Sequence, residues 1–346
     1  MTGENLVYWF EELGKEHNDM VGKKCANLGQ MTRMGLAVPP GFAISIALYE
    51  KFIHETGTDE KMASYVRGLG ELKGVGISVF REISETLRSM IEAKEMPSSI
   101  REAIASYYAN LCKKTGIENV PVSVRSAGTE SRPGMFETYL NVRGIEEVIQ
   151  KVKIVWASAY TARAVAFRVN KGFPVLGDEL GVAVPKMVNA RASGITFTVD
   201  PVTADDSKIL LEANWGLGEG VVSGAESVDG FVVDKENLEI VARHVGNKVR
   251  CVVYTKDGAD WADVPAPMQS MPCISDEEIV EIARVAKDAE KSLGGPQDME
   301  WAVDQDLPFP ESLFWLQTRP AKMAAKKKVS ASSHIADLIA KKFGGV

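Results

Sequence analysis

Apolar residues in the first third of the chain recur at intervals of three and four positions, the period of an amphipathic helix. This spacing predicts helices over residues 49–57, 79–93 and 98–116. A serine near the start of the third segment is a candidate N-cap, and its Lys-Lys-Thr-Gly ending is typical of a helix C-terminus. A longer amphipathic helix is predicted over residues 145–172. We therefore expect the N-terminal region to be mainly helical.

Two runs between these helices alternate apolar with small or polar residues, as half-buried strands do. Residues 120–126 form the first run and stop at a Ser-Ala-Gly loop, so the strand would deliver Arg125 at its end. Residues 138–142 form the second run. The loop between the two predicted strands is rich in glycine and small residues.

After residue 172 the pattern changes to short runs of β-branched residues separated by Gly, Asp and Pro. These runs are residues 181–188, 192–200, 208–215, 228–234 and 247–255. One helix, over residues 275–295, begins with a capping-box pattern of Ser275 and Glu278. Two further strands are predicted over 298–304 and 313–318, on either side of a proline-bearing insertion. The C-terminal half is therefore expected to be mainly β.

Length and composition indicate an ordinary globular protein of more than one domain. The chain has 346 residues, more than a single hydrophobic core usually serves. It is 45% hydrophobic and 25% charged, which excludes disorder throughout. No apolar run is long enough for a membrane helix, and the acidic N-terminus does not resemble a signal peptide. We therefore expect a cytoplasmic protein with no membrane partner.

Charge and cysteine content narrow the possible partners further. The net charge of −7 disfavours nucleic acid as a ligand. Residues 321–346, with six lysines and one aspartate, are predicted to form a basic tail on an acidic body. The four cysteines form no Cys-X-X-Cys pair and have no neighbouring histidine, so neither a disulfide framework nor a zinc site is predicted.

Two segments of the N-terminal half place cationic side chains beside glycines. Lys23 and Lys24 lie within Gly-Lys-Lys-Cys-Ala-Asn-Leu-Gly, where a lysine can bind phosphate as a point charge. Arg125 offers a planar fork of donors that fits phosphate oxygens. The alternatives are a solvated loop lysine and an arginine in a surface salt bridge.

A glycine-rich stretch, residues 216–224, follows a predicted strand in the C-terminal half. Its spacing fits neither the GxGxxG dinucleotide pattern nor the GxxxxGK[ST] P-loop. A tight loop in a β-rich lobe is the alternative interpretation.

The last pair of predicted strands carries the most specific chemistry. Alternation would place Asp298 and Glu300 on one face of the first strand, and Gln317 and Arg319 together on the second. Carboxylate and amide oxygens suit magnesium, and an arginine beside the metal can neutralise charge on a transferred phosphoryl group. The alternative is a cross-strand ion pair on a solvated sheet.

In their order along the chain, these segments resemble the nucleotide-binding module of the phosphoenolpyruvate synthase and pyruvate phosphate dikinase family. The matching segments are GKKCANLGQM, VRSAGTESRPGMFETYLN, SGITFTVDP, GLGEGVVSG, QDMEW and LQTRP. The resemblance covers about residues 5–320. It implies an α+β ATP-grasp fold, with a mixed N-terminal lobe over residues 1–178, a β-rich second lobe over 179–320, and the tail over 321–346.

The resemblance also implies that ATP and magnesium bind between these lobes. The implied nucleotide-binding residues are Lys24, Arg125, Thr138, Glu212, Asp298, Glu300, Gln317 and Arg319. Among them, Lys24, Arg125 and Arg319 take catalytic positions, and Glu300 and Gln317 take magnesium positions. Pro185 stands near where the family often has a glutamine beside the base, which leaves base selectivity open. Residues 127–135 are predicted to form a lid over the phosphates.

In this family, ATP phosphorylates a histidine on a separate swivelling domain, which carries the group to a distant acceptor. None of the four histidines, His17, His54, His244 and His334, lies in the family's glycine-rich histidine motif. A histidine-bearing partner subunit or domain with the acceptor site is therefore expected, with phenol, pyruvate or a similar small molecule as acceptor. As a stand-alone chain the protein most resembles the ATP-binding subunit of phenylphosphate synthase. The alternatives are an excised N-terminal domain of a longer enzyme and a non-catalytic ATP-sensing module.

Overall fold

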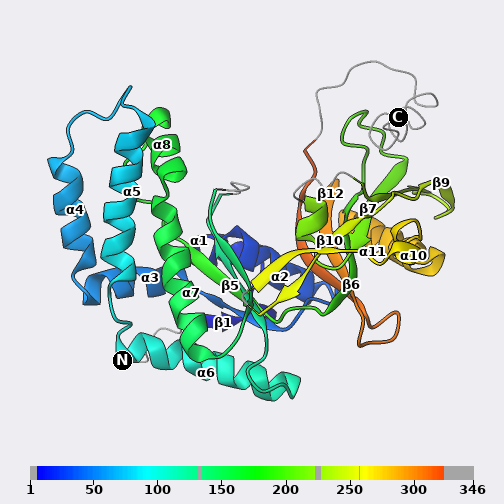
Figure 1. Cartoon of the computed structure of the whole chain (residues 1–346), viewed down its shortest axis with the longest axis horizontal. Helices are drawn as coiled ribbons and strands as arrows, with labels where there is room; N and C mark the ends of the chain where they lie inside the picture. Colours follow the sequence, from blue (N-terminus) through cyan, green and yellow to red (C-terminus); the bar gives the residue numbers. More distant parts are fainter. Residues whose placement is uncertain (1–5, 131–134, 223–226, 257, 323–346) are drawn as a thin grey trace. The chain divides into compact units, whose positions relative to one another are not determined.

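The computed structural model describes residues 6–130, 135–222, 227–256 and 258–322, which form two compact units (Figure 1). Unit 1 comprises Met1–Arg33 and Pro40–Met187, and unit 2 comprises Met34–Pro39 and Val188–Val346. Each unit combines helices with antiparallel sheet. The predicted α+β fold class is therefore confirmed.

Unit 1 is built on a five-stranded antiparallel sheet with the order β1-β2-β5-β3-β4. Its strands are β1 Val7–Trp9, β2 Gly41–Ile44, β3 Val122–Ala127, β4 Thr138–Val142 and β5 Gly181–Pro185. The strands predicted to end near Arg125 and to begin at Thr138 are thus present. Among the strands that the structure describes, β3 has a neighbour on each side, whereas β4 is an edge strand that pairs only with β3.

Helices pack around this sheet, and their buried faces follow the predicted spacing. The helices are α1 Asn18–Val21, α2 Lys23–Arg33, α3 Ile46–Glu55, α4 Thr58–Gly68, α5 Ile77–Glu92, α6 Ser98–Thr115, α7 Ile145–Ala157 and α8 Ala162–Lys171, with short 3-10 turns η1 Phe10–Glu12, η2 Lys15–His17 and η3 Ser158–Tyr160. In α5, Phe80, Ile83, Leu87 and Ile91 recur at helical spacing and join the same buried core as Trp156 of α7. Helix α6 begins with Pro97 at its N-cap position, so the predicted serine cap is wrong.

The single long helix predicted over residues 145–172 is also wrong, because the chain breaks between α7 and α8. The Ser158 hydroxyl donates to the carbonyl of Val155 over 2.6 Å at the end of α7. Thr161 then adopts extended backbone, and its hydroxyl oxygen accepts from the Ala164 amide to begin α8. The hydrophobic spacing continues across the break, so the pattern alone does not reveal it.

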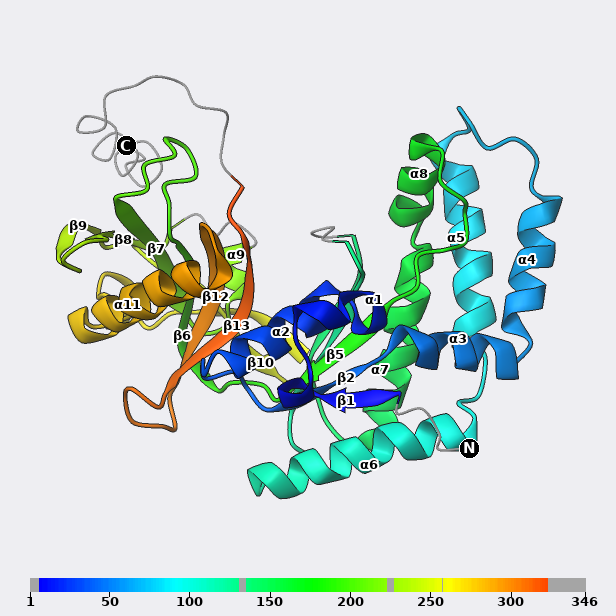
Figure 2. The same cartoon turned by 180° about the vertical axis from the view of Figure 1, so that it is seen from behind.

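Unit 2 contains a six-stranded antiparallel sheet with the order β13-β12-β6-β7-β8-β9. Its strands are β6 Ala190–Phe197, β7 Lys208–Trp215, β8 Asp229–Asp234, β9 Ile240–His244, β12 Gln297–Asp304 and β13 Leu313–Pro320. Helix α11, Asp276–Leu293, lies across one face of this sheet (Figure 2). The predicted capping box is confirmed, since Ser275 and Glu278 bond reciprocally to each other's backbone amides.

A separate hairpin of unit 2, β10 Arg250–Thr255 and β11 Gly258–Asp263, follows the six-stranded sheet's edge strand β9 in sequence. Two short helices, α9 Glu219–Val222 and α10 Ala266–Gln269, lie before and after the hairpin in sequence. The start of the hairpin is held by a fully buried ion pair in which Lys248 Nζ lies 2.6 Å from Asp229 Oδ1. Asp229 also accepts from the backbone amides of Gly246 and Cys273, so the buried carboxylate is well satisfied.

The division between the units falls after Met187 rather than after residue 178. Strand β5 was expected in the second lobe, but it pairs with β2 and β3 in the middle of the unit 1 sheet. These partners lie far from β5 in sequence, so a change in local pattern could not locate the boundary. In the part of the chain that the structure describes, no helix is both long and apolar enough to span a membrane.

Candidate functional site

The strongest candidate chemistry lies on the β12–β13 pair, which the structure places side by side. Asp298 is directly opposite Arg319, and Glu300 is directly opposite Gln317. Arg319 donates through Nε to Asp298 Oδ2 over 2.7 Å, and its Nη2 lies 2.7 Å from the same oxygen. Gln317 Nε2 lies 3.2 Å from Glu300 Oε1. The sequence prediction that these four side chains converge is therefore confirmed.

Asp298 pairs with Arg319 from a buried position, where its charged form is disfavoured. Burial raises the pKa of Asp298, and the attraction of Arg319 only partly opposes this effect. The negative charges of Glu300 and Glu212 raise the pKa further. Asp298 Oδ1 is buried and has no hydrogen-bond partner in the structure. A buried acceptor without a hydrogen-bond partner can bind a donor or a cation that arrives with a ligand.

Glu212 joins the same row of side chains from β7. Ile195 of β6 lies directly opposite both Glu212 and Glu300, so the two carboxylates lie on one face with Ile195 between them. Along these strands, half-exposed positions such as Ile195 and Glu212 alternate with buried ones such as Leu211 and Met299. Helix α11 contacts β12, β6 and β7. Because buried side chains of a sheet pack against the helix that covers it, we infer that the half-exposed row lies on the opposite face.

Glu300 and Gln317 fit the donor set that magnesium requires when it binds beside phosphates. Magnesium usually takes one or two carboxylates, several waters and phosphate oxygens rather than an all-protein cage. Among the described residues, no group of three or more His, Cys, Asp and Glu side chains is arranged to hold a metal ion. A site of one carboxylate and one amide oxygen would depend on the nucleotide for its remaining ligands.

In unit 1, the structure brings the other three predicted residues into one neighbourhood. Thr138 of β4 is directly opposite Arg125 of β3. Lys24 lies in the first turn of α2, and the Lys23 amide at the start of this helix donates to the carbonyl of Gly128 over 2.8 Å. Burial raises the pKa of the Cys25 thiol to about 12, and the charges of Lys24 and Arg125 both oppose that rise. Lys24 and Arg125 therefore both lie near this thiol.

Gly22 explains why α2 can begin so close to the end of β3. Its backbone has a φ of +80°, and a Cβ atom built there would lie 1.9 Å from the carbonyl oxygen of Ala127. Only glycine accepts both the conformation and the contact. The glycine that precedes the lysine pair in the sequence is thus a structural requirement for placing Lys24 beside the Arg125 strand.

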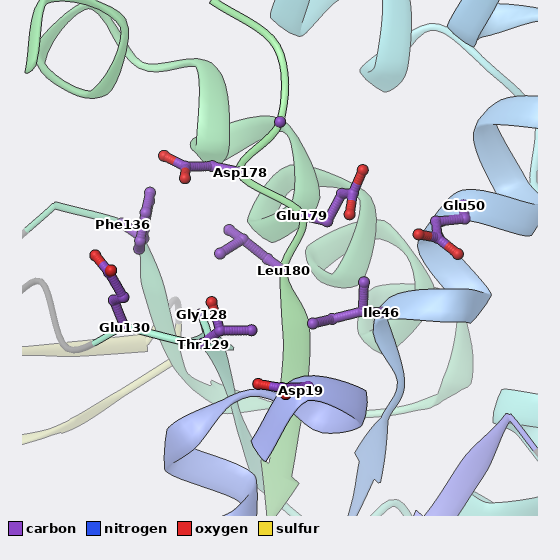
Figure 3. A pocket seen from close by; sticks show the side chains of 11 residues that line it. Asp19, Ile46, Glu50, Gly128, Thr129, Glu130, Phe136, Asp178, Glu179 and Leu180 are labelled. Carbon is purple, nitrogen blue, oxygen red and sulfur yellow. The ribbon is translucent and has the colours of Figure 1, made fainter. Parts of the chain in front are cut away.

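Beside the first residues of the predicted lid, unit 1 has a pocket of about 200 Å³ (Figure 3). Its charged lining residues are all acidic: Asp19, Glu50, Glu130, Asp178 and Glu179. Burial raises the pKa of Glu179, and the negative charge of Glu50 raises it further. These carboxylates would repel a triphosphate, so we do not place the phosphates in this pocket. Nothing in the local sequence pattern predicted it.

Two sequence predictions fall partly outside the described residues. The proposed lid includes Ser131 and Arg132, and the glycine-rich stretch includes Gly224; all three lie in segments that the structure does not describe. In the described part of that stretch, Gly216 has a φ of +71° and packs tightly against the Val252 carbonyl of β10. His334 in the basic tail also lies outside the described residues.

Comparison with known proteins agrees with this arrangement of motifs. The sequence matches the family described as "Pyruvate phosphate dikinase, AMP/ATP-binding domain" over residues 18–338. The chain belongs to this family. Membership confirms the predicted family and shows that the chain carries the family's AMP/ATP-binding domain.

Relatives of this dikinase family member include longer proteins. A probable phosphoenolpyruvate synthase of Staphylothermus marinus is 37% identical over 345 residues, covering 91% of this chain and 41% of the relative. Another from Methanocaldococcus jannaschii is 36% identical, covering 97% of this chain and 28% of the relative. The phosphoenolpyruvate synthase of Aeropyrum pernix is 35% identical, covering 95% and 44%. The chain therefore spans less than half the length of these relatives.

Solved structures give weaker matches. The ATP-grasp ligase PsnB complexed with minimal precursor covers 77% of this chain at 10% identity, with a TM-score of 0.22. A score this low does not place any residue of the site. The assignment of the family therefore depends on the sequence match.

Proposed function

We propose that this chain is the ATP-binding component of a dikinase-type phosphotransferase with an ATP-grasp fold. It binds Mg-ATP and transfers a phosphoryl group to a histidine on a partner subunit or domain. The observation that carries this proposal is the cross-strand set on β12 and β13, Asp298 with Arg319 and Glu300 with Gln317, in a chain of the dikinase AMP/ATP-binding family. An accidental surface ion pair would not require the second, adjacent pair.

Each unit carries its own set of candidate side chains. Lys24, Arg125 and Thr138 offer an ammonium, a guanidinium and a hydroxyl close together, a combination that suits phosphate oxygens. Glu300 and Gln317 would hold magnesium, which when bound neutralises phosphate charge. Glu212, on the same face as Glu300, is assigned to the nucleotide side of the site.

Arg319 is the residue we assign to the charge that develops during transfer. Its Nε and Nη2 both engage Asp298, which fixes the orientation of the guanidinium plane. A donor fixed before the reaction stabilises the transition state without reorganisation during the step. Phosphoryl transfer depends mainly on positioning and charge neutralisation, so these side chains supply what the chemistry needs.

The acceptor is supplied by a partner in this proposal. The matched relatives extend well beyond the region that this chain covers, which supports a separate histidine-bearing segment. Their names favour phosphoenolpyruvate chemistry over phenol as the final step. A cytoplasmic location is the corresponding expectation.

A non-catalytic ATP sensor is the second candidate, and the altered position at Pro185 favours it. This residue ends β5, near the position where the family often has a glutamine beside the base. A sensor could bind nucleotide without a positioned Arg319. Retention of the whole cross-strand set supports the catalytic proposal instead.

The direct test uses ATP that is radiolabelled in its β- and γ-phosphates, so that either transferred phosphate is detected. The chain is mixed with its natural histidine-bearing partner and magnesium, and the protein label is tested for the acid lability and base stability of phosphohistidine. Transfer to the partner supports the catalytic proposal. Tight ATP binding with no transfer would support the sensor.

A further inference from the structure

Strand β4 carries Thr138 but receives little support from the sheet. It is an edge strand, and its pairing with β3 contains an irregularity between Val122 and Val124. Asn141 within the strand has a φ of +54°, a conformation that breaks regular pairing. At the other end, the Ser126 amide reaches the Glu137 carbonyl only at 3.5 Å. The sheet alone therefore fixes Thr138 weakly.

Arg125 is placed differently, although it lies directly opposite Thr138. Its strand is paired on both sides, with β5 and with β4. A strand with two neighbours is held by two hydrogen-bond ladders, whereas an edge strand has one. If both residues are to contact the same phosphate group, β4 needs a second support.

The side chain of Glu137, immediately before β4, provides that support. Its Oε1 lies 3.3 Å from Arg88 Nη1 on α5, and its Oε2 accepts a hydrogen bond from the Tyr139 hydroxyl. The Glu137 amide donates to the Ser158 hydroxyl over 3.3 Å. The ring of Tyr139 is in turn covered by the Lys151 ammonium of α7, 4.6 Å from the ring centroid. Glu137 thus attaches the start of β4 to the helices.

These contacts lie on the side of the chain away from the ligand position. Successive side chains of an extended segment point to opposite faces, so Glu137 and Tyr139 share a face and Thr138 points the other way. Glu137 has both carboxylate oxygens engaged and contacts no predicted ligand-binding side chain in the described hydrogen bonds. Any effect of Glu137 on the nucleotide must therefore pass through the position of β4.

We propose that Glu137 is a positioning residue, which holds the edge strand β4 so that Thr138 is presented beside Arg125 to the phosphates of ATP. This inference rests on the proposed function, in which Thr138 contacts those phosphates. Adenosine lacks phosphates, so its binding does not depend on Thr138. The affinity ratio of ATP to adenosine therefore separates positioning from general stability.

The experiment measures binding of Mg-ATP and of adenosine to the full chain by calorimetry, with thermal unfolding recorded for each variant. Glu137→Gln keeps the size of the side chain and removes its charge. Glu146→Gln is the matched control, because Glu146 of α7 pairs with Arg101 of α6. Arg88→Lys retains a cation for Glu137, whereas Arg88→Gln does not.

We expect Glu137→Gln and Arg88→Gln to weaken ATP binding by about tenfold while adenosine binding stays unchanged, since a hydrogen bond to a charged group is commonly worth that factor. Arg88→Lys should recover most of the ATP affinity, and Glu146→Gln should match the wild type. If Glu137→Gln leaves the ratio unchanged, or lowers both affinities equally, Glu137 is only structural. If the wild type itself prefers adenosine to ATP, the proposed function fails, and the role of Glu137 fails with it.

Discussion

At the scale of single residues, Asp298 connects the arrangement of the site to its response to pH. Its pKa is raised, with burial as the largest cause, although the charge and hydrogen bond of Arg319 lower it. A raised pKa means that the folded state holds the proton more tightly than the unfolded state, so stability falls as pH rises through the folded pKa. The asparagine of the Asp298→Asn variant cannot ionise, so this variant should not lose stability in this way.

We therefore predict that wild-type protein loses free energy of unfolding relative to Asp298→Asn as pH rises from about 4 to about 8. Urea denaturation of both proteins across this range measures the difference. If the wild type instead gains stability relative to the variant, the pairing with Arg319 outweighs burial. The pKa of Asp298 would then be lowered rather than raised in the folded protein.

Arg319 and Lys24 should respond differently to truncation, although both are assigned to phosphates. Arg319→Ala should slow phosphoryl transfer about a hundredfold with little change in ATP affinity, because the charge it meets grows in the transition state. Lys24→Ala should also weaken ATP binding, because an ammonium in the first turn of α2 would contact phosphates in the ground state. Single-turnover rates and calorimetric affinities separate these effects. Equal losses of rate and affinity in both variants would contradict the two assignments.

At the scale of elements, the close approach of α2 to β3 depends on one glycine. A Cβ atom at Gly22 would lie 1.9 Å from the Ala127 carbonyl oxygen, whereas Gly35 has a similar φ of +81° and no atom within 4 Å of its Cβ position. Gly35→Ala should cost about 1–2 kcal/mol from backbone conformation alone. Gly22→Ala should cost at least about 3 kcal/mol, because it adds a steric clash with the backbone.

Urea denaturation compares these two variants, and ATP affinity provides a second measurement. The Gly22 variant should also bind ATP more weakly, since any shift at the start of α2 moves Lys24. Equal stability losses at the two glycines would mean that the contact with Ala127 relaxes without cost. The tight junction would then not be needed to place Lys24.

Sequence alone predicted elements best where local pattern and chemistry agree. The β12–β13 pair was predictable because two alternating runs flank a short insertion and carry complementary side chains. The break between α7 and α8 was not, because Ser158 and Thr161 interrupt the backbone without interrupting the hydrophobic spacing. The role of Glu137 was also not predictable, since it depends on β4 being an edge strand and on Arg88 of a distant helix.

At the scale of the whole molecule, the order of strands in the unit 1 sheet sets the boundary between the units, which the sequence pattern did not locate. Strand β5 is inserted between β2 and β3, which moves the boundary between the units to Met187. Such pairing over long sequence distances leaves no local signal. By contrast, the α+β class and the motifs of both units could be predicted from the sequence, because each motif retains its residue types and spacing within a short segment.

Label transfer tests the catalytic proposal at the scale of the whole assembly. The chain, its natural histidine-bearing partner, magnesium and ATP labelled in its β- and γ-phosphates are mixed, with Arg319→Ala as the matched control. We predict magnesium-dependent, acid-labile label on the partner's histidine, reduced about a hundredfold in rate by the Arg319 substitution. Sustained ATP turnover on a small acceptor by this chain alone, or no label on the partner, would contradict the proposal.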